Sequence, residues 1–131
     1  MQSRGSTPPP APKVLVVDDD KDMVALLTGL LKAAGYRTVS AFDAMQGGMV
    51  AARELPALII LDLQMPAGGG VQLLERLTTS LRTQAIPVLA ITANTQKGME
   101  EYMRRRGATD FLAKPFEPEA RRAAGRTALG T

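Results

Sequence analysis

Polar side chains follow four short apolar runs of the chain, at the point where each run ends. They are Asp18, Asp19 and Asp20 after the first apolar run, Asp62 after the third, Thr92 after the fourth and Lys114 after the fifth. If these runs are parallel strands, their carboxyl ends meet at one edge of a sheet, where the sites of such sheets lie. We therefore expect carboxylates, a hydroxyl and an ammonium group to form one site.

The carboxylates of this group favour a divalent cation. The chain contains no histidine and no cysteine, so the metal ligands would be oxygen atoms, which predicts Mg²⁺ with Mn²⁺ as the substitute. Carboxylates brought close together repel one another, and a cation between them removes that cost. A different interpretation is that the acidic run caps the following helix. We prefer it for Asp20 and Asp22, and for Asp18 and Asp19 both interpretations stay open.

Asp62 has the position of a nucleophile. It stands directly behind the apolar run Leu58–Leu61 and ahead of the glycine-rich loop Gln64–Gly70. A carboxylate beside Mg²⁺ can attack phosphorus and form an aspartyl phosphate. The transferred oxygens then need other donors, and Lys114 can supply a positive charge while Thr92 supplies a hydroxyl. The alternatives are a solvated lysine and a threonine that ends a strand without a function.

The runs and the segments between them predict alternating strands and helices. Five short apolar segments predict buried strands, at Lys13–Val17, Tyr36–Ser40, Ala57–Leu61, Pro87–Ile91 and Thr109–Ala113. Helical spacing of apolar residues predicts helices at Lys21–Ala34, Asp43–Glu54, Gly70–Leu81, Thr95–Arg106 and Glu119–Leu129. Gly47 and Gly48 weaken the second helix. Thr95 is a candidate N-cap for the fourth helix, and the alanine-rich fifth helix should be short or frayed.

Five such units predict an α/β fold, a doubly wound five-stranded parallel sheet with helices on both faces. We expect one domain over residues 13–131, because a chain of 131 residues can bury one sizeable core. Residues 1–12 are rich in proline and poor in apolar side chains, which predicts a disordered tail.

Composition limits the partners. The net charge is +3 and the pI is about 9.6, but much of the positive excess lies near the two ends of the chain, so we expect no direct binding to nucleic acid. No stretch approaches the roughly 18 apolar residues of a membrane span, and the start of the chain has no apolar signal segment. We therefore expect a cytoplasmic protein without a membrane partner.

Four motifs resemble one family. VLVVDDD at 14–20, LIILDLQMP at 58–66, ITAN at 91–94 and FLAKPF at 111–116 are similar to the motifs of the receiver domain of bacterial two-component response regulators, the CheY-like domains. The resemblance covers Lys13 to about Arg122 and includes the spacing between the motifs. It implies a flavodoxin-like (βα)5 fold with strand order 2-1-3-4-5.

The resemblance also implies a role for each residue of the group. Asp62 would be the phosphoacceptor, Thr92 and Lys114 would contact the phosphoryl group, and Phe111 would be the switch aromatic, although simple core packing also explains a phenylalanine there. The metal ligands would be Asp18, Asp19, Asp62 and the backbone carbonyl of Gln64.

The implied function is a phosphorylation-dependent signalling switch. A sensor histidine kinase or a phosphotransfer protein would donate the phosphoryl group, and the partner-binding surface would then change toward an output protein that the sequence does not identify. Such a domain is not an enzyme in the usual sense, since it catalyses only its own phosphorylation and dephosphorylation. Because the fifth helix offers mainly alanines for packing, dimerisation through it is uncertain.

Two other functions compete. Asp18-Asp19-Asp20-Lys21 partly matches the D-x-D motif of haloacid-dehalogenase-like phosphatases, which would make Asp18 the nucleophile and the protein a hydrolase. A receiver-like module that is never phosphorylated is the third possibility, which the intact acceptor, acid pair, Thr92 and Lys114 disfavour. The site that becomes phosphorylated separates the three.

Overall fold

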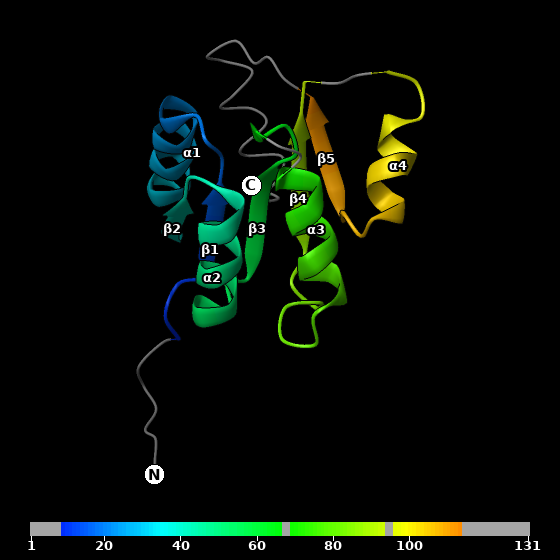
Figure 1. The fold of residues 1–131 in the computed structure, drawn as a ribbon. Coiled ribbons are helices and arrows are strands. Elements are labelled where there is room, and N and C mark those ends of the chain that lie inside the picture. Colours follow the sequence, from blue (N-terminus) through cyan, green and yellow to red (C-terminus); the bar gives the residue numbers. More distant parts are fainter. Residues whose placement is uncertain (1–8, 67–68, 94–95, 114–131) are drawn as a thin grey trace.

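The computed structural model describes residues 9–66, 69–93 and 96–113. Along the chain these form β1 (Lys13–Val17), α1 (Lys21–Ala33), β2 (Arg37–Ala41), α2 (Ala44–Glu54), β3 (Leu58–Asp62), α3 (Gly69–Thr79), β4 (Val88–Thr92), α4 (Met99–Arg105) and β5 (Asp110–Ala113). The five strands form one parallel sheet in the order β2-β1-β3-β4-β5 (Figure 1). This confirms the predicted α/β fold and its strand order.

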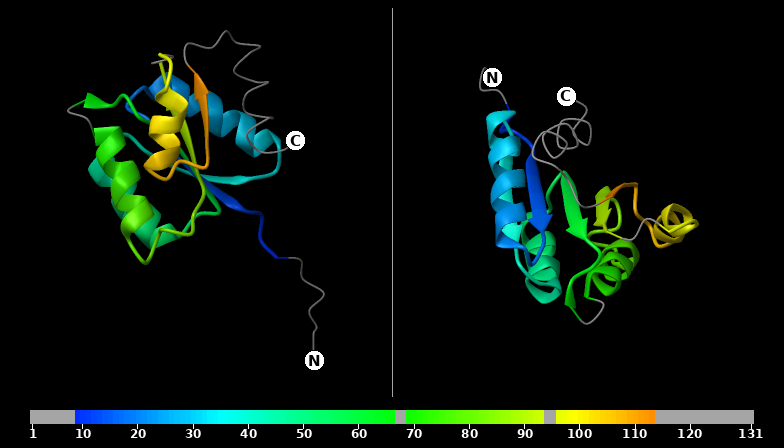
Figure 2. Two further views of the ribbon diagram at one scale, coloured as in Figure 1. Left: turned by 90° about the vertical axis from the view of Figure 1, so that its right-hand side faces the viewer. Right: turned by 90° about the horizontal axis from the view of Figure 1, so that it is seen from above.

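Helices cover both faces of the sheet (Figure 2). Alternate residues of a strand point to opposite faces, so Val14 and Val16 of β1 pack with α1, whereas Leu15 and Val17 pack on the face covered by α2 and α3. On the α1 face the buried core also contains Met23, Val24, Leu27 and Leu31 from the helix. On the other face it contains Val50 and Ala51 from α2 and Leu73, Leu74 and Leu77 from α3. The apolar periodicity thus sets which side of each helix meets the sheet.

The start of α1 shows why the acidic run has two roles. Asp20 is the N-cap, and its carboxylate accepts hydrogen bonds from the backbone N–H groups of Asp22 (3.0 Å) and Met23 (3.2 Å). A side-chain oxygen at this position satisfies donors that have no partner inside the helix. The capping interpretation is therefore confirmed for Asp20, and Asp22 lies in the first turn.

Tertiary packing compensates for the low helix propensity of the glycines in α2. The helix is continuous over Ala44–Glu54, and Asp43 caps it by accepting the backbone N–H of Gln46 at 2.7 Å. A Cβ at Gly47 would lie 2.8 Å from Leu73 Cδ2 and 3.0 Å from Val17 Cγ1. Glycine there lets α2 approach α3 and β1 closely, so the helix propensity lost to it is offset by tertiary contact.

Several predicted boundaries were wrong by one or two residues. Strands β2, β3 and β4 begin and end one residue later than predicted. β5 and α2 begin one residue later, and α1 ends one residue earlier. Asp62 and Thr92 belong to strands because strand pairing depends on backbone hydrogen bonds and not on side-chain polarity. The pairing of β3 with β4 reaches this point, where the Leu63 N–H donates to the Ile91 carbonyl at 2.9 Å. Tyr36 is outside β2 since its N–H donates to Leu31 in α1 at 3.0 Å.

The helices show two further corrections. The third helix is Gly69–Thr79 rather than Gly70–Leu81, because turns follow Ser80. The fourth begins only at Met99. Gly98 before it has a φ of 91°, a left-handed conformation that does not occur inside a right-handed helix. Gln96, Lys97 and Gly98 lie outside the helix, so the prediction of a helix starting at Thr95 was wrong.

Parts of the predicted organisation lie outside the described residues. These are residues 1–8 of the predicted tail, Thr95, and the predicted fifth helix at Glu119–Leu129. Within the described ranges no helix combines the length and the apolar character that crossing a membrane requires.

Candidate functional site

Three strand ends meet at one rim of the sheet. Asp18 follows β1, whereas Asp62 and Thr92 are the last residues of β3 and β4. The registers align these ends, since Val17 pairs with Leu61 and Asp62 pairs with Ile91. The acids after β1 and at the end of β3 thus lie together at the carboxyl edge of the sheet, where the sequence predicts them.

Three carboxylates form the centre of the site. One oxygen each of Asp18, Asp19 and Asp62 lies within 4.8 Å of the others. Asp18 is 1% exposed and Asp62 3% exposed, whereas Asp19 is open to solvent. Carboxylates this close, two of them shielded from water, repel each other strongly unless a cation lies between them. The donor set, all oxygen and without nitrogen or sulfur, fits a hard cation such as Mg²⁺ or Mn²⁺.

A turn after β1 directs adjacent aspartates toward the same rim. The N–H of Asp18 donates to the Ala41 carbonyl at 3.1 Å, and Asp18 Oδ1 accepts the N–H of Asp20 at 3.0 Å. The chain therefore leaves the strand direction before Asp20 caps α1, and Asp18 and Asp19 lie outside the helix. In the D-x-D match the second acid is Asp20, whose Oδ1 caps α1.

The acceptor candidate Asp62 is held by its own loop. Its Oδ1 accepts the backbone N–H of Gln64 at 3.0 Å, which fixes the plane of the carboxylate. The start of α3 then packs directly on the backbone of this strand end, because a Cβ at Gly70 would lie 2.3 Å from the Asp62 carbonyl oxygen and 2.5 Å from Leu63 Cα. Only glycine allows this approach. Sequence reasoning did not predict this role, although three consecutive glycines after the LQMP motif were a signal.

Gln64 also connects two loops. Its side-chain Oε1 accepts the backbone N–H of Ala93, the residue after Thr92. The loop that follows the acceptor is thereby joined to the loop that follows β4. The family resemblance pointed to the backbone carbonyl of Gln64 as a metal ligand, and the sequence gave no signal for this side-chain hydrogen bond.

The remaining predicted residues lie on the β4 and β5 side. Thr92 is 2% exposed and pairs in register with Ala113 at the end of β5. Lys114 follows Ala113 directly but lies outside the described residues. Phe111 is half-buried and packs against the core on the α2 and α3 face. Core packing therefore describes Phe111 in this structure, and its role as a switch stays a prediction.

Comparison with known proteins gives a consistent result. The family model described as the response regulator receiver domain matches residues 14–125. The chain is 33% identical over 107 residues to the protein PilH of Pseudomonas aeruginosa, covering 82% of this chain and 88% of PilH. It is 38% identical over 108 residues to the DNA-binding dual master transcriptional regulator RpaA of Synechocystis, covering 82% of this chain but only 45% of RpaA.

Solved structures agree with the sequence comparison. The fold is similar to that of the chemotaxis response regulator CheY4 of Vibrio cholerae, with a TM-score of 0.79 and 27% identity over 89% of this chain and 98% of that chain. The receiver domain of NtrX from Brucella abortus gives a TM-score of 0.74 at 31% identity, over 90% of this chain and 98% of that chain.

Proposed function

The chain belongs to the response regulator receiver domain family, whose members act in phosphorylation-dependent signalling, and on that premise we propose that Asp62 is its phosphoacceptor. The phosphoryl donor would be a histidine kinase or a phosphotransfer protein. The observation that supports this assignment is the approach of the Asp18, Asp19 and Asp62 carboxylates to within 4.8 Å of one another. Such a cluster suits a divalent cation and an anionic nucleophile in one place.

Each residue of the site would have a separate role in phosphoryl transfer. An oxygen of Asp62 attacks phosphorus, the new O–P bond forms as the N–P bond to the donor imidazole breaks, and the Gln64 N–H keeps the carboxylate in position. Asp18 and Asp19, with Asp62 and the backbone carbonyl of Gln64, would hold Mg²⁺. When bound, Mg²⁺ would neutralise the carboxylates and stabilise charge on the transferred oxygens.

The proposed output step involves the neighbouring strand ends. The Thr92 hydroxyl and the Lys114 ammonium group would donate hydrogen bonds to the phosphoryl oxygens. Movement of Thr92 toward those oxygens would be transmitted to Phe111, because Thr92 lies in β4 and its strand pairs with β5, which carries Phe111. Phosphorylation would then shift the population between two arrangements of the surface near α4 and β5.

A labelling experiment tests the acceptor. The protein is incubated with Mg²⁺ and acetyl phosphate, trapped by reduction, and mapped by mass spectrometry. We expect one label, on Asp62, and none in Asp62→Asn, because the amide keeps the shape of the side chain but lacks the anionic nucleophile. Asp22→Asn is the matched control, since Asp22 is an exposed acid in the first turn of α1 and its loss should leave the labelling unchanged.

The contrary outcomes are distinct. Label on Asp18, or steady turnover of phosphate esters, would favour the phosphatase function. Undiminished label in Asp62→Asn would remove Asp62 from the role. An unlabelled but folded wild-type protein that still responds to Mg²⁺ would favour a binding module.

A further inference from the structure

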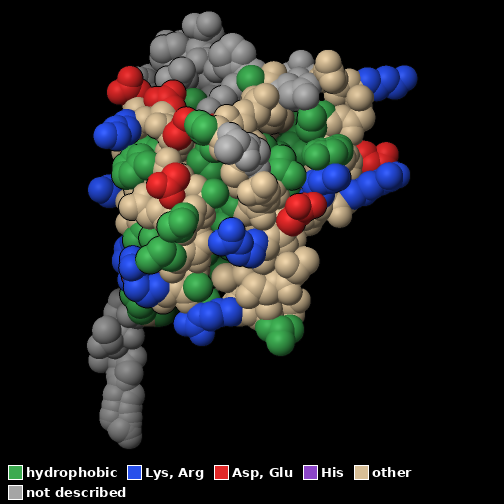
Figure 3. All heavy atoms as spheres, in the orientation of Figure 1, with side chains coloured by type: hydrophobic (Ala, Val, Ile, Leu, Met, Phe, Trp, Pro, Cys, Tyr) green, Lys and Arg blue, Asp and Glu red, His purple; other side chains and the backbone are tan. Residues whose placement is uncertain are grey.

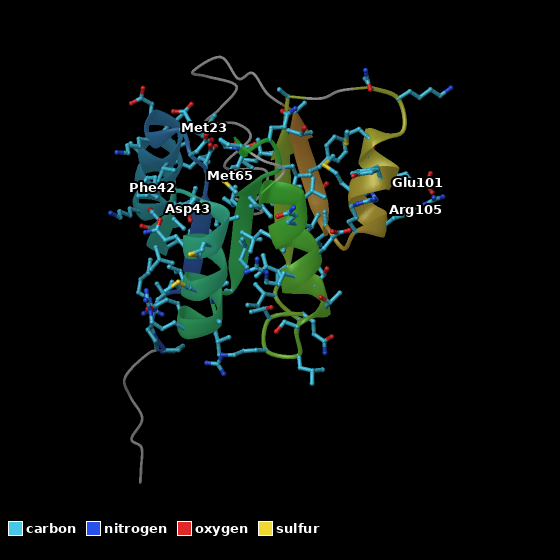
Figure 4. All side chains as sticks on the ribbon, in the orientation of Figure 1. Met23, Phe42, Asp43, Met65, Glu101 and Arg105 are labelled. Atoms are coloured by element: carbon cyan, nitrogen blue, oxygen red, sulfur yellow. The ribbon has the colours of Figure 1, made fainter. Side chains whose placement is uncertain are left out.

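An exposed apolar stripe runs along α2, on the face opposite to the sheet. Met45 and Met49 are four residues apart in α2, so they lie on one side of the helix, and the exposed Phe42 precedes the N-cap Asp43. Met45 is 72% exposed and Met49 is 62% exposed. Figure 3 shows apolar side chains gathered over α2, and Figure 4 shows Phe42 and Asp43 beside its first turn. A cluster of exposed apolar side chains of this kind is typical of a binding surface.

A groove between α2 and α3 continues this stripe. It has a volume of about 320 Å³. Met49 and Ala52 line it from α2, Leu77 lines it from α3, and Ser80 and Thr83 close it beyond the end of α3. Thr83 is already used, since its Oγ1 donates to the Leu77 carbonyl at 2.8 Å. What the groove offers a ligand is therefore mainly apolar surface.

Gly48 differs from its neighbour Gly47 in the space that surrounds it. No backbone atom is near the position of a Cβ at Gly48, where the nearest atoms are Arg76 Nη1 at 3.3 Å and Leu73 Cδ1 at 3.5 Å. Packing on the sheet thus requires glycine at 47 but not at 48. A glycine inside a helix costs about 1 kcal/mol relative to alanine. At position 48 the missing side chain keeps the groove open beneath Arg76.

The rim of the groove is positively charged. Arg76 lines it from α3, and Arg82 reaches across to α2, where its Nε donates to the Ala52 carbonyl at 2.6 Å. Neither arginine forms an ion pair with any residue in the described ranges. The nearby acid Glu75 instead faces Arg106, with 3.6 Å between Oε2 and Nε. An occupant with carboxylates beside its apolar contacts would complement this rim.

The occupant is most simply a helix. The groove lies between two helices, and the outermost strands of the sheet are β2 and β5. An extended peptide in the groove would therefore find no strand to pair with. A helix satisfies its own backbone hydrogen bonds and needs only an apolar side to bind. We propose that the groove between α2 and α3 binds an amphipathic helix of a partner protein that carries acidic residues beside its apolar face. Methionines suit such a surface because they adapt to the partner's side chains.

Peptide selection on the whole chain tests this proposal. A displayed library of helical peptides of about 14 residues, roughly four turns, is selected on the immobilised protein. We expect enriched sequences with apolar residues at helical spacing and Asp or Glu beside them. Amide spectra of the complex should change at residues 45–53 and 73–83. The result should not depend on phosphorylation, so its failure and the failure of the Asp62 assignment are distinguishable.

Variants separate docking from folding. Arg76→Glu and Met49→Asp should each weaken the selected peptides about tenfold or more. Gly48→Leu should abolish binding without lowering the melting temperature, because it fills the groove and removes a glycine from the helix. Lys32→Glu makes the same kind of charge change on α1, across the sheet, and should leave the affinity unchanged.

Other results would overturn the proposal. They are peptides that are basic, peptides whose shifts map to α1 or α4, no enrichment at all, or an affinity that Arg76→Glu does not change. Sedimentation provides the last test. If the wild-type chain is a dimer and Met49→Asp makes it a monomer, the occupant is a second copy of this chain and not a partner helix.

Discussion

The carboxyl edge and the amino edge of the sheet differ in how their charged side chains are arranged. At the carboxyl edge, like charges are brought together, with Asp18 and Asp62 both buried and their carboxylates within 4.8 Å of each other and of Asp19. At the amino edge, opposite charges meet, since Lys13 at the start of β1 forms a 2.6 Å ion pair with Glu54 at the end of α2.

Other polar groups at the amino edge are matched in the same way. The Thr109 hydroxyl accepts the N–H of Val88 at 3.2 Å, and the Lys13 carbonyl accepts the N–H of Ala57 at 2.8 Å. A matched donor and acceptor contribute modestly to stability, whereas clustered like charges oppose it. The amino edge therefore holds the fold together, and the carboxyl edge keeps an electrostatic cost that a cation can relieve. Removing a charged group should therefore lower stability at the amino edge but not, in the absence of metal, at the carboxyl edge.

The largest effect on stability is expected at Gly70, where α3 touches the end of β3. Gly70→Ala would place a Cβ 2.3 Å from the Asp62 carbonyl oxygen, an atom of the backbone that cannot rotate away. We expect the free energy of unfolding, measured in urea, to fall by about 3 kcal/mol. Phosphorylation of Asp62 should slow as well, because the strand end must shift.

Gly29→Ala is the matched control. Gly29 lies inside α1, and a Cβ added there would meet no atom within 4 Å, so alanine should raise the free energy of unfolding by about 1 kcal/mol. If both substitutions had the same sign, the close approach of α3 to Asp62 would not be what requires glycine at position 70.

The sequence predicted the fold better than it predicted the local contacts of the site. Short apolar runs and helical spacing predicted the parallel α/β sheet, whose carboxyl edge brings Asp18 and Asp62 together, and the family resemblance supplied the strand order. The contact of Gly70 with Asp62 and the hydrogen bond from Ala93 to Gln64 depend on how two loops meet in space. The run of glycines indicates a close approach of the backbone but not the atoms it approaches, and the sequence gives no signal for the hydrogen bond.

The start of α4 shows the same limit. A threonine before a helical segment is a good cap by local rules, yet the helix begins after Gly98 in a left-handed conformation. Its first turn is supported by other means, including the exposed acids Glu100 and Glu101, which pair with arginines four residues later. Local propensity located the helix but not the residue at which it begins.

The second effect is that of metal ions on the carboxyl edge. Mg²⁺ at about ten times its dissociation constant should raise the free energy of unfolding by about 1.4 kcal/mol, because it binds only the folded cluster. Asp19→Asn should remove most of this gain by removing one ligand, while the metal-free protein becomes no less stable. Thermal unfolding with Mg²⁺ and with chelator measures both the stability gained from Mg²⁺ and the stability of the metal-free protein.

Asp22→Asn is again the control for this measurement. It removes one exposed carboxylate three residues away and should leave the Mg²⁺ effect as in the wild-type protein. Equal loss of the effect in both variants would mean that Mg²⁺ acts through the general negative charge of this region and not through the cluster.

The smallest effect is expected from the matched pair at the amino edge, and it should depend on pH. The hydrogen bond from the Lys13 ammonium group, followed by that from Arg53, holds the pKa of Glu54 below its ordinary value of 4.5. A carboxyl group with a lowered pKa binds fewer protons in the folded state than in the unfolded state. Its contribution to stability is therefore present above pH 4.5 and is lost as the pH falls through the folded-state pKa.

Lys13→Met tests this contribution, because methionine keeps much of the length of the side chain and removes its charge. The variant should be less stable than the wild-type protein in urea at pH 7, and the difference should shrink as Glu54 becomes protonated. In a carbon-detected titration the pKa of Glu54 should move back toward 4.5 in the variant, with Arg53 accounting for what lowering remains. A stability difference that stayed constant down to acid pH would show that Lys13 acts through packing of its aliphatic chain, and the contrast between the two edges would then not be one of charge.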